Sequence, residues 1–293
     1  MKSVALLIVL MALLSASCTT DKSMSAKSDE NPSLVKAMTF NIRYGSAKDG
    51  ENHWDKRRHM VFKVIQDFNP DFVGLQEALK FQIDEILKSN PRYKSTGDGR
   101  DGGMNGEFSN ILYDHNKFEL IESETFWLSD TPDKVSKSWG NSLHRICSWA
   151  LLKNKTTAKQ IYVFNTHFDH RSVPSRIQSS RLVIEKIRER KFKEIPFILT
   201  GDFNADSASL EMNYFSSNNI LDSDTFVSHE DPNRGSFSSF KYGNYKKKID
   251  YIFIKDREWE VKKSEIIRYS ENQRYPSDHF PIYAELILKD RKM

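Results

Sequence analysis

Six short polar clusters are the parts of this sequence whose residue types could do chemistry. Five of them follow an apolar run that predicts a strand, and the sixth opens such a run. Because functional residues commonly lie on loops at the ends of a rigid scaffold, we expect the clusters to meet at one rim of a sheet. Each cluster alone is typical of a turn or a cap, but the ordered set predicts a site: residues 40–43, 75–77, 165–170, 200–204, 248–251 and 277–281.

The residue types in these clusters favour a hard divalent cation. Asp, Glu and Asn supply the oxygen ligands that Mg²⁺ and Ca²⁺ prefer. The sequence contains two cysteines, Cys18 and Cys147, and no His-Glu-x-x-His segment, which disfavours a zinc site. It also lacks a Gly-x-Ser-x-Gly segment, which disfavours a serine hydrolase. The net charge of +4 permits an anionic substrate without requiring one.

Strands and helices must position these clusters. Amphipathic spacing predicts helices at residues 53–68, 78–87 and 176–190. Apolar runs that predict strands are more numerous, and several are adjacent and antiparallel, so we expect an α/β sandwich of two packed sheets with flanking helices. The predicted strands are residues 35–42, 72–75, 110–113, 119–128, 146–153, 161–165, 196–199, 249–254, 259–269 and 282–288.

A single domain at residues 34–289 accounts for these runs, because no second linker interrupts them. Residues 97–106 contain five glycines and predict a surface loop. A phosphate cradle is the alternative there, although the segment matches no phosphate-loop pattern. Cys147 lies within an apolar run, so we expect a buried, unreactive thiol rather than a nucleophile.

The first residues predict export and a lipid anchor. Lys2 precedes an apolar run at residues 4–14 and a group of small residues, which indicates a signal peptide at residues 1–17. Cys18 follows directly, so we expect a membrane-anchored lipoprotein outside the cytoplasm, in the periplasm or at the cell surface. Secretion without lipid is the alternative. Residues 18–33 predict a flexible tether that begins at the lipidated cysteine. We expect a monomer without a protein partner.

The ordered clusters resemble the motifs of the endonuclease/exonuclease/phosphatase superfamily, which has the deoxyribonuclease-I-like fold. The segments at residues 201–204 and 277–279, together with the one around His167, are specific as a set. The resemblance runs from Val35 to Leu286 and is closest to a bacterial lipoprotein branch. It implies a four-layer α/β sandwich, in which two mainly antiparallel sheets pack face to face and are flanked by helices.

The same resemblance implies a divalent cation, Mg²⁺ with Mn²⁺ or Ca²⁺ as alternatives. Glu77 would bind the metal directly, Asn41 would hold the metal or its waters, and Asp278 would complete the shell. Arg43 stands where some branches carry an acidic residue, which leaves open whether one or two metals bind. A cation here would offset the negative charge that develops on a phosphoryl group.

The resemblance also implies catalytic roles for five further residues. Asp202 and Asn204 would orient the attacking water and the phosphate, and His167 would bind a phosphoryl oxygen. His279 would pair with Asp250, which fixes the imidazole tautomer and raises its basicity. His279 would then act as a general base or as a phosphate-binding cation.

Three more residues are candidate substrate contacts. Arg145 could clamp a phosphate with its guanidinium group or form a structural ion pair. Asp169 and His170 could contact the substrate or support residues that do. The resemblance therefore implies a hydrolase for a phosphoester substrate, either a small molecule or a nucleic acid. A phosphodiesterase or nuclease-like enzyme is the first expectation, a phosphomonoesterase for a sugar or inositol phosphate the second, and a non-catalytic surface-binding lipoprotein the third.

Overall fold

The computed structural model describes residues 33–243, 245 and 247–289. The predicted signal peptide at residues 1–17, the predicted lipidation site Cys18 and nearly all of the predicted tether at residues 18–33 lie outside the described residues. Export, lipidation and the tether therefore stay predictions.

Two six-stranded sheets form the centre of the described structure, with strand orders β11-β12-β1-β2-β4-β3 and β5-β6-β7-β8-β10-β9. The first sheet consists of β1 (Leu34–Asn41), β2 (Phe72–Ala78), β3 (Tyr93–Thr96), β4 (Phe108–Asp114), β11 (Trp259–Ile266) and β12 (Ile282–Leu288). The second sheet consists of β5 (Phe118–Trp127), β6 (Ile146–Asn154), β7 (Gln160–His167), β8 (Phe197–Asp202), β9 (Leu221–Asp222) and β10 (Asp250–Ile254).

One parallel pair of strands lies at the centre of each sheet. β1 pairs with β2 in parallel in the first sheet, and β7 pairs with β8 in parallel in the second. The other pairings between neighbouring strands of the described residues are antiparallel. Because parallel neighbours end at the same edge, Asn41 and Glu77 leave the first sheet together, and His167 and Asp202 leave the second sheet together.

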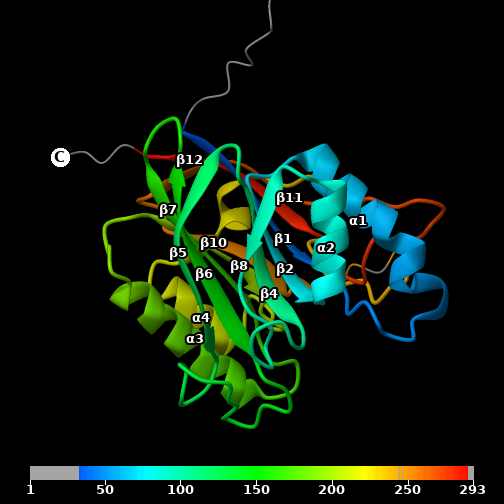
Figure 1. The fold of residues 1–293 in the computed structure, drawn as a ribbon, viewed down its shortest axis with the longest axis horizontal. Helices are drawn as coiled ribbons and strands as arrows, with labels where there is room; N and C mark the ends of the chain where they lie inside the picture. Colours follow the sequence, from blue (N-terminus) through cyan, green and yellow to red (C-terminus); the bar gives the residue numbers. More distant parts are fainter. Residues whose placement is uncertain (1–32, 244, 246, 290–293) are drawn as a thin grey trace, which may run out of the picture. The chain divides into compact units, whose positions relative to one another are not determined.

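The helices cover the outer faces of the two sheets. Figure 1 shows α1 and α2 on one side of the strands and α3 and α4 on the other. Separate apolar clusters fill the space beneath each pair of helices and the space between the sheets. This arrangement confirms the predicted four-layer sandwich. The helices are α1 (Trp54–Phe68), α2 (Lys80–Ser89), α3 (Val173–Glu189) and α4 (Leu210–Ser216), with short 3₁₀ turns η1 (Gly50–Asn52) and η2 (Ser223–Phe226).

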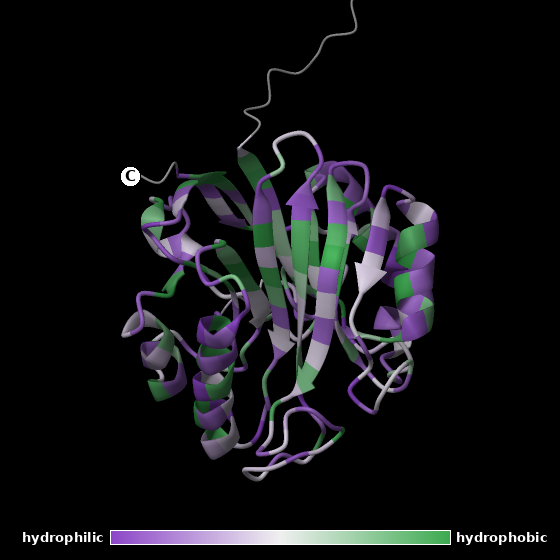
Figure 2. Ribbon diagram, turned by 60° about the vertical axis from the view of Figure 1, so that its left-hand side comes forward, coloured by the Kyte–Doolittle hydropathy of each residue, from purple (hydrophilic) through white to green (hydrophobic). Residues whose placement is uncertain are grey.

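The strands at the centre carry apolar residues on both faces because both faces are covered. In β1, Val35 and Ala37 belong to the cluster between the sheets, whereas Met38 and Phe40 belong to the cluster beneath α1 and α2. In Figure 2 the strands carry many green, apolar segments among purple ones, and the helices are also mixed. Cys147 is buried as predicted, and burial raises the pKa of its thiol.

Three short elements were absent from the sequence prediction: β3, β9 and α4. α4 has seven residues and buries Met212 and Phe215 against the second sheet, which is too short a pattern to predict a helix reliably. Over the described residues, no helix combines the length and the apolar character that crossing a bilayer requires.

A buried amide joins the two sheets beneath the site. Asn165 of β7 is fully buried, and its Nδ2 donates to the backbone oxygens of Leu75 at 2.8 Å and Asn110 at 2.9 Å in the first sheet. Its Oδ1 accepts from Gln76 Nε2 at 2.6 Å. Gly74 makes room for this contact, because a Cβ at that position would lie 2.5 Å from Asn165 Oδ1. The network fixes the ends of β2 and β7 relative to each other.

Replacing Asn165 with alanine should lower the free energy of unfolding by about 3 kcal/mol, because buried carbonyl groups lose their donors. Urea denaturation followed by tryptophan fluorescence measures this change. Asn213→Ala, on the exposed face of α4, is the matched control and should change stability by less than about 0.5 kcal/mol. Equal losses in the two variants would contradict a structural role for Asn165.

Candidate active site

A cavity of about 500 Å³ opens at the rim where the central strands of both sheets end. Asn41 and Asp250 do not line it but form hydrogen bonds to residues that do. The structure therefore brings most of the residues that the sequence singles out to one place. Those that line the cavity are Glu77, Arg145, His167, His170, Asp202, Asn204, Asp278 and His279.

A bulge in β2 turns Glu77 toward the cavity. Gln76 and Glu77 lie opposite the single residue Ser109 of β4, and Glu77 has a φ of 58°. This left-handed conformation costs a non-glycine residue about 1–2 kcal/mol, so the surroundings must hold it. The Glu77 carboxylate accepts hydrogen bonds from Asn41 Nδ2 at 3.0 Å and from the backbone N–H of Tyr44 at 3.0 Å. The strained backbone thus serves to place one carboxylate.

Asn41 connects carboxylates that come from different sheets. Its Nδ2 donates to Glu77 Oε1 and to Asp202 Oδ2, each at 3.0 Å, and its Oδ1 accepts from the backbone N–H of Arg43 at 3.0 Å. Burial alone would raise the pKa of Glu77, but nearby His279 and the hydrogen bond from Asn41 outweigh this effect and lower it. Asn41 thus positions two carboxylates, and its contact with the metal or its waters stays a prediction.

His279 is held by the carboxylate of Asp250. His279 Nδ1 lies 2.9 Å from Asp250 Oδ2, which also accepts from Ser236 Oγ at 2.6 Å. Burial alone would lower the pKa of His279, but the charges of Asp250 and Asp202 outweigh it and raise the pKa well above its usual range. Because Asp250 holds Nδ1, the Nε2 atom lies toward Asp202, 3.8 Å from Asp202 Oδ2.

Asp202 has the properties of a base that works near neutral pH. Burial and the neighbouring charge of Asp250 raise the pKa of Asp202 to about 7. Its Oδ1 accepts from the backbone N–H of Asn204 at 2.9 Å, and Asn204 Nδ2 lies 3.1 Å from His167 Nε2. Burial and the charge of Arg145 lower the pKa of His167 well below its usual range, so this imidazole is neutral. Asp202, Asn204 and His167 thus form one connected group.

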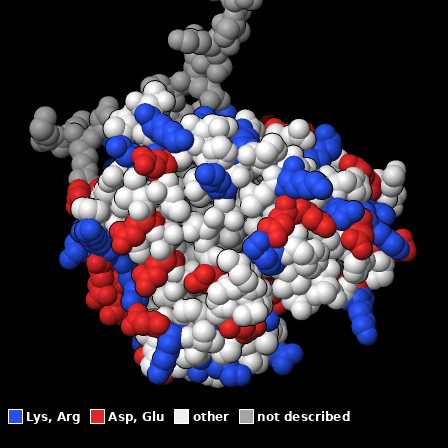
Figure 3. Space-filling model, in the orientation of Figure 1, with Lys and Arg blue, Asp and Glu red and all other residues white. Residues whose placement is uncertain are grey.

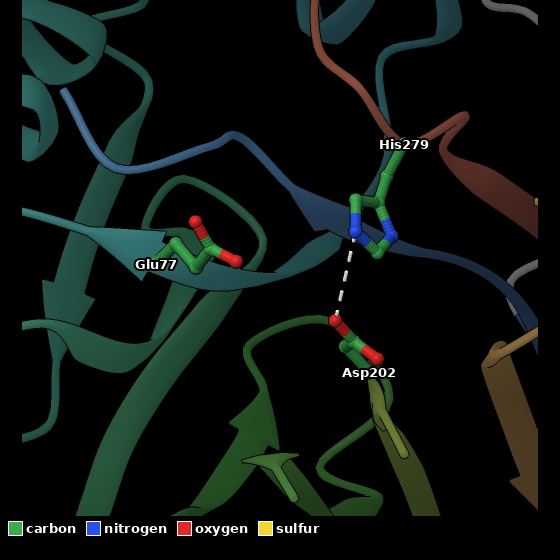
Figure 4. A group of neighbouring side chains, drawn as sticks. All are labelled: Glu77, Asp202 and His279. Carbon is green, nitrogen blue, oxygen red and sulfur yellow. Dashed lines mark ion pairs between the residues drawn. The ribbon is translucent and has the colours of Figure 1, made fainter. Parts of the chain in front are cut away.

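Carboxylates at the centre of the cavity fit a hard divalent cation. Glu77, Asp202 and His279 each offer one possible ligand atom, and these atoms lie within 4.8 Å of one another. Figure 4 shows the three side chains reaching toward a common space from the ends of β2 and β8 and from the loop before β12. Hard divalent cations prefer oxygen ligands to imidazole nitrogen, so the carboxylates are the better donors. Asp278, which lines the same cavity, adds a third carboxylate.

Arg43 places a fixed positive charge beside these carboxylates. Its guanidinium group pairs with Asp49 through Nε at 2.9 Å. The same group lies 3.9 Å from Glu77 Oε2 and 4.0 Å from Asp278 Oδ2. Asp49, Asp278 and Glu77 together raise the pKa of Arg43 although burial opposes them. Arg43 thus partly neutralises the carboxylates of Glu77 and Asp278.

The three predicted substrate contacts separate into two groups. Arg145 and His170 line the cavity, with Arg145 NH2 at 3.0 Å from His170 Nδ1. Asp169 is fully buried and does not line the cavity. Its Oδ1 accepts from the backbone N–H groups of Arg171 and Ser172 at 2.9 and 2.7 Å, and its Oδ2 lies 3.7 Å from Arg145 Nε. The prediction that Asp169 contacts the substrate is therefore corrected: it holds Arg145 and the start of α3.

The model of the Endonuclease/Exonuclease/phosphatase family matches residues 38–279, which span both sheets and the site. The chain belongs to this family. That membership agrees with the position of the cavity at the ends of the central strands. The narrower expectation of a lipoprotein branch stays a prediction.

Solved structures from Bacteroides are similar over almost their whole length. A mannosyl-6-phosphatase from Bacteroides thetaiotaomicron is 33% identical with a TM-score of 0.82, over 87% of this chain and 100% of that chain. A family member from Bacteroides vulgatus is 35% identical with a TM-score of 0.81, over 87% and 99% of the two chains. An uncharacterised protein of Acanthamoeba polyphaga mimivirus is 31% identical over 165 residues, which are 54% of this chain and 61% of that protein. The chain thus spans less than two thirds of this curated relative.

Several residues that support this family site were not found by sequence reasoning. Arg57 of α1 is 1% exposed and donates to the backbone oxygens of Ile42 at 2.8 Å and Pro276 at 2.7 Å, so it holds the loops that carry Arg43 and Asp278. A signal existed, because Arg57 lies on the same helical face as the apolar residues of α1. Ser236, beside Asp250, stands in a region without a recognisable pattern and gave no such signal.

Proposed function

We propose that this protein hydrolyses phosphoesters in a reaction that depends on a divalent cation, Mg²⁺ before Mn²⁺ or Ca²⁺. The observation that carries the proposal is the convergence of carboxylates from two sheets beside the His279–Asp250 pair in one cavity. Glu77 and Asp278 are the residues that would hold the cation. A bound cation would supply charge that stabilises the developing negative charge on the phosphoryl group.

The chain's own residues supply the remaining chemistry. Asp202 accepts a proton from the attacking water, since a base with a pKa near the working pH is the most effective. Asn204 orients that water or a phosphoryl oxygen through its amide. His279 donates a hydrogen bond from Nε2 to the phosphoryl group while Asp250 holds its Nδ1–H. The phosphate-binding role of His279 is favoured over the general-base role because the buried carboxylates of Asp250 and Asp202 beside the ring favour its charged form.

One cation per site is part of the proposal. Arg43 brings its guanidinium group within 4.0 Å of both Glu77 and Asp278, so its charge compensates these carboxylates without a second metal. A second divalent cation would meet direct repulsion from Arg43 at this distance.

For the substrate, a phosphomonoester of a small molecule is favoured over the diester that was expected first. Support comes from the 33% identity to a mannosyl-6-phosphatase over that enzyme's whole length. Acidic and basic side chains are interspersed over the face of the molecule that Figure 3 shows.

A panel of phosphoesters tests the proposal on purified protein. Hydrolysis of p-nitrophenyl phosphate and sugar phosphates with Mg²⁺, abolished by EDTA, is the expected result. A preference for bis-p-nitrophenyl phosphate would favour a phosphodiester substrate over a phosphomonoester. Inactivity on the whole panel with Mg²⁺, Mn²⁺ and Ca²⁺ would contradict the proposed function and favour a non-catalytic lipoprotein.

We also propose that the enzyme works outside the cytoplasm on a lipid anchor, which rests on residues 1–18 of the sequence alone. Cells that express the full chain should incorporate labelled palmitate into it, and Cys18→Ser should abolish the label. A labelled Cys18→Ser protein would refute lipidation at Cys18.

A further inference from the structure

An ion pair in the cavity wall has no part in the proposed hydrolysis. Glu107 Oε2 lies 2.7 Å from Arg100 NH1, and the two side chains are only 14% and 13% exposed. Arg100 belongs to the glycine-rich segment at residues 97–106, which the sequence predicts to be a surface loop. The backbone N–H of Arg100 donates to the backbone oxygen of Glu107 at 2.9 Å, and the backbone oxygen of Arg100 accepts from Trp127 Nε1 at 2.7 Å. The pair is therefore held in a fixed position.

Arg145 extends this polar wall. It is 4% exposed, and over the residues that the structure describes its buried Nε has no hydrogen-bond partner. Arg100, Glu107, Arg145 and His167 line both the main cavity and a small hollow of about 10 Å³ beside it. The wall is thus a built group of charged side chains beside the proposed site of hydrolysis.

Glu107 is the informative member, because a carboxylate disfavours the binding of a phosphate in the same cavity. It lies outside the group of side chains whose atoms could share a metal ion. Burial raises the pKa of Glu107, and Arg100 opposes that rise. A carboxylate beside a guanidinium group presents acceptors and donors together, which matches a hydroxyl group that both donates and accepts. A strand of nucleic acid would instead bring further negative charge toward Glu107.

We propose that Glu107 and Arg100 bind hydroxyl groups of the leaving group, so that the substrate is the phosphomonoester of a sugar or another polyol. The inference rests on the proposed phosphoester hydrolysis. Glu107 accepts a hydrogen bond from a substrate hydroxyl, and Arg100 donates one to the same or the next hydroxyl oxygen. Both are specificity residues, because they contact the part of the substrate that does not react.

Glu107→Gln tests the inference, because it keeps the size of the side chain and removes its charge. With mannose 6-phosphate the variant should lose about tenfold or more in kcat/KM, the scale of losing one charged hydrogen bond. With p-nitrophenyl phosphate, whose leaving group has no hydroxyl beyond the ester oxygen, kcat/KM should change less than about twofold. Glu119→Gln, an exposed glutamate on β5, is the matched control and should leave both values unchanged.

If the Glu107→Gln variant fails to fold, a measurement on the unaltered protein tests the same inference. At least one monodeoxy analogue of a hydrolysed sugar phosphate should be about tenfold worse than its parent. The inference would be overturned if Glu107→Gln lost kcat/KM equally on both substrates or lost it on neither. It would also be overturned if the unaltered protein hydrolysed every deoxy analogue as well as the parent sugar phosphate. Cleavage of diesters alone would overturn the inference about the substrate but leave the proposed phosphoester hydrolysis intact. Failure to hydrolyse any phosphoester would contradict the proposed function.

Discussion

Replacing His279 with alanine should lower the turnover number by at least about 10², the scale expected when a positioned proton-carrying group is lost. The imidazole is 4% exposed, and its proton is retained by Asp250 at 2.9 Å. Alanine removes the hydrogen bond to the phosphoryl group and leaves the Asp250 carboxylate buried without its cation. Steady-state kinetics on p-nitrophenyl phosphate with saturating Mg²⁺ measures the effect.

The control for this variant is His59→Ala, because His59 is an exposed histidine on α1 that pairs with Glu271 at the surface. Its turnover number should remain within about twofold of the original, as is usual for surface substitutions. Asp250→Asn should reproduce part of the loss, because the amide cannot stabilise the charged imidazole. A His279→Ala protein that keeps its melting temperature and its full rate would exclude His279 from the mechanism.

Replacing Glu77 with glutamine should weaken Mg²⁺ binding by at least about tenfold. Glutamine can still accept one hydrogen bond from Asn41 or from the Tyr44 backbone, so the bulge in β2 should survive while the negative charge disappears. Isothermal titration calorimetry measures affinity and stoichiometry without substrate. One binding site per chain is expected in the unaltered protein because Arg43 stands beside Glu77 and Asp278.

Glu51→Gln is the control for the metal titration, since Glu51 is exposed and pairs with Lys56 away from the cavity lining. It should bind Mg²⁺ like the unaltered protein. An unchanged titration curve for Glu77→Gln would show that Glu77 is not a ligand. Two ions per chain in the unaltered protein would refute the role given to Arg43.

The helices and central strands were predictable because their patterns are local. The apolar positions of α1 repeat with helical spacing and end at Asn69, whose left-handed φ of 47° closes the helix before Pro70. The strand ends were harder to predict. The sequence predicts that β2 stops at Leu75, whereas the structure extends it to Ala78 through the bulge at Glu77. A bulge depends on the partner strand, which no local pattern specifies.

The site was predictable as a set of residues but not as a set of roles. The polar clusters at the strand ends include Glu77, Asp202 and His279, which line the cavity, and the supports Asn41 and Asp250. Asp169 was misassigned because a carboxylate in such a cluster can face the cavity or turn inward to hold Arg145. Glu107 was passed over because a single glutamate beside a glycine-rich segment carries no pattern of its own.

The sequence by itself determined which elements form and which residue types gather at their ends, because both depend on neighbours along the chain. Only the tertiary structure decided which of these side chains meet. Asn41 and Asp202 are 161 positions apart, yet their side chains lie 3.0 Å from each other. The physical reason is that burial and charge act through space: burial and the like charge of Asp250 raise the pKa of Asp202 to about 7, whereas the opposite charges of Asp250 and Asp202 raise the pKa of His279 against the effect of burial.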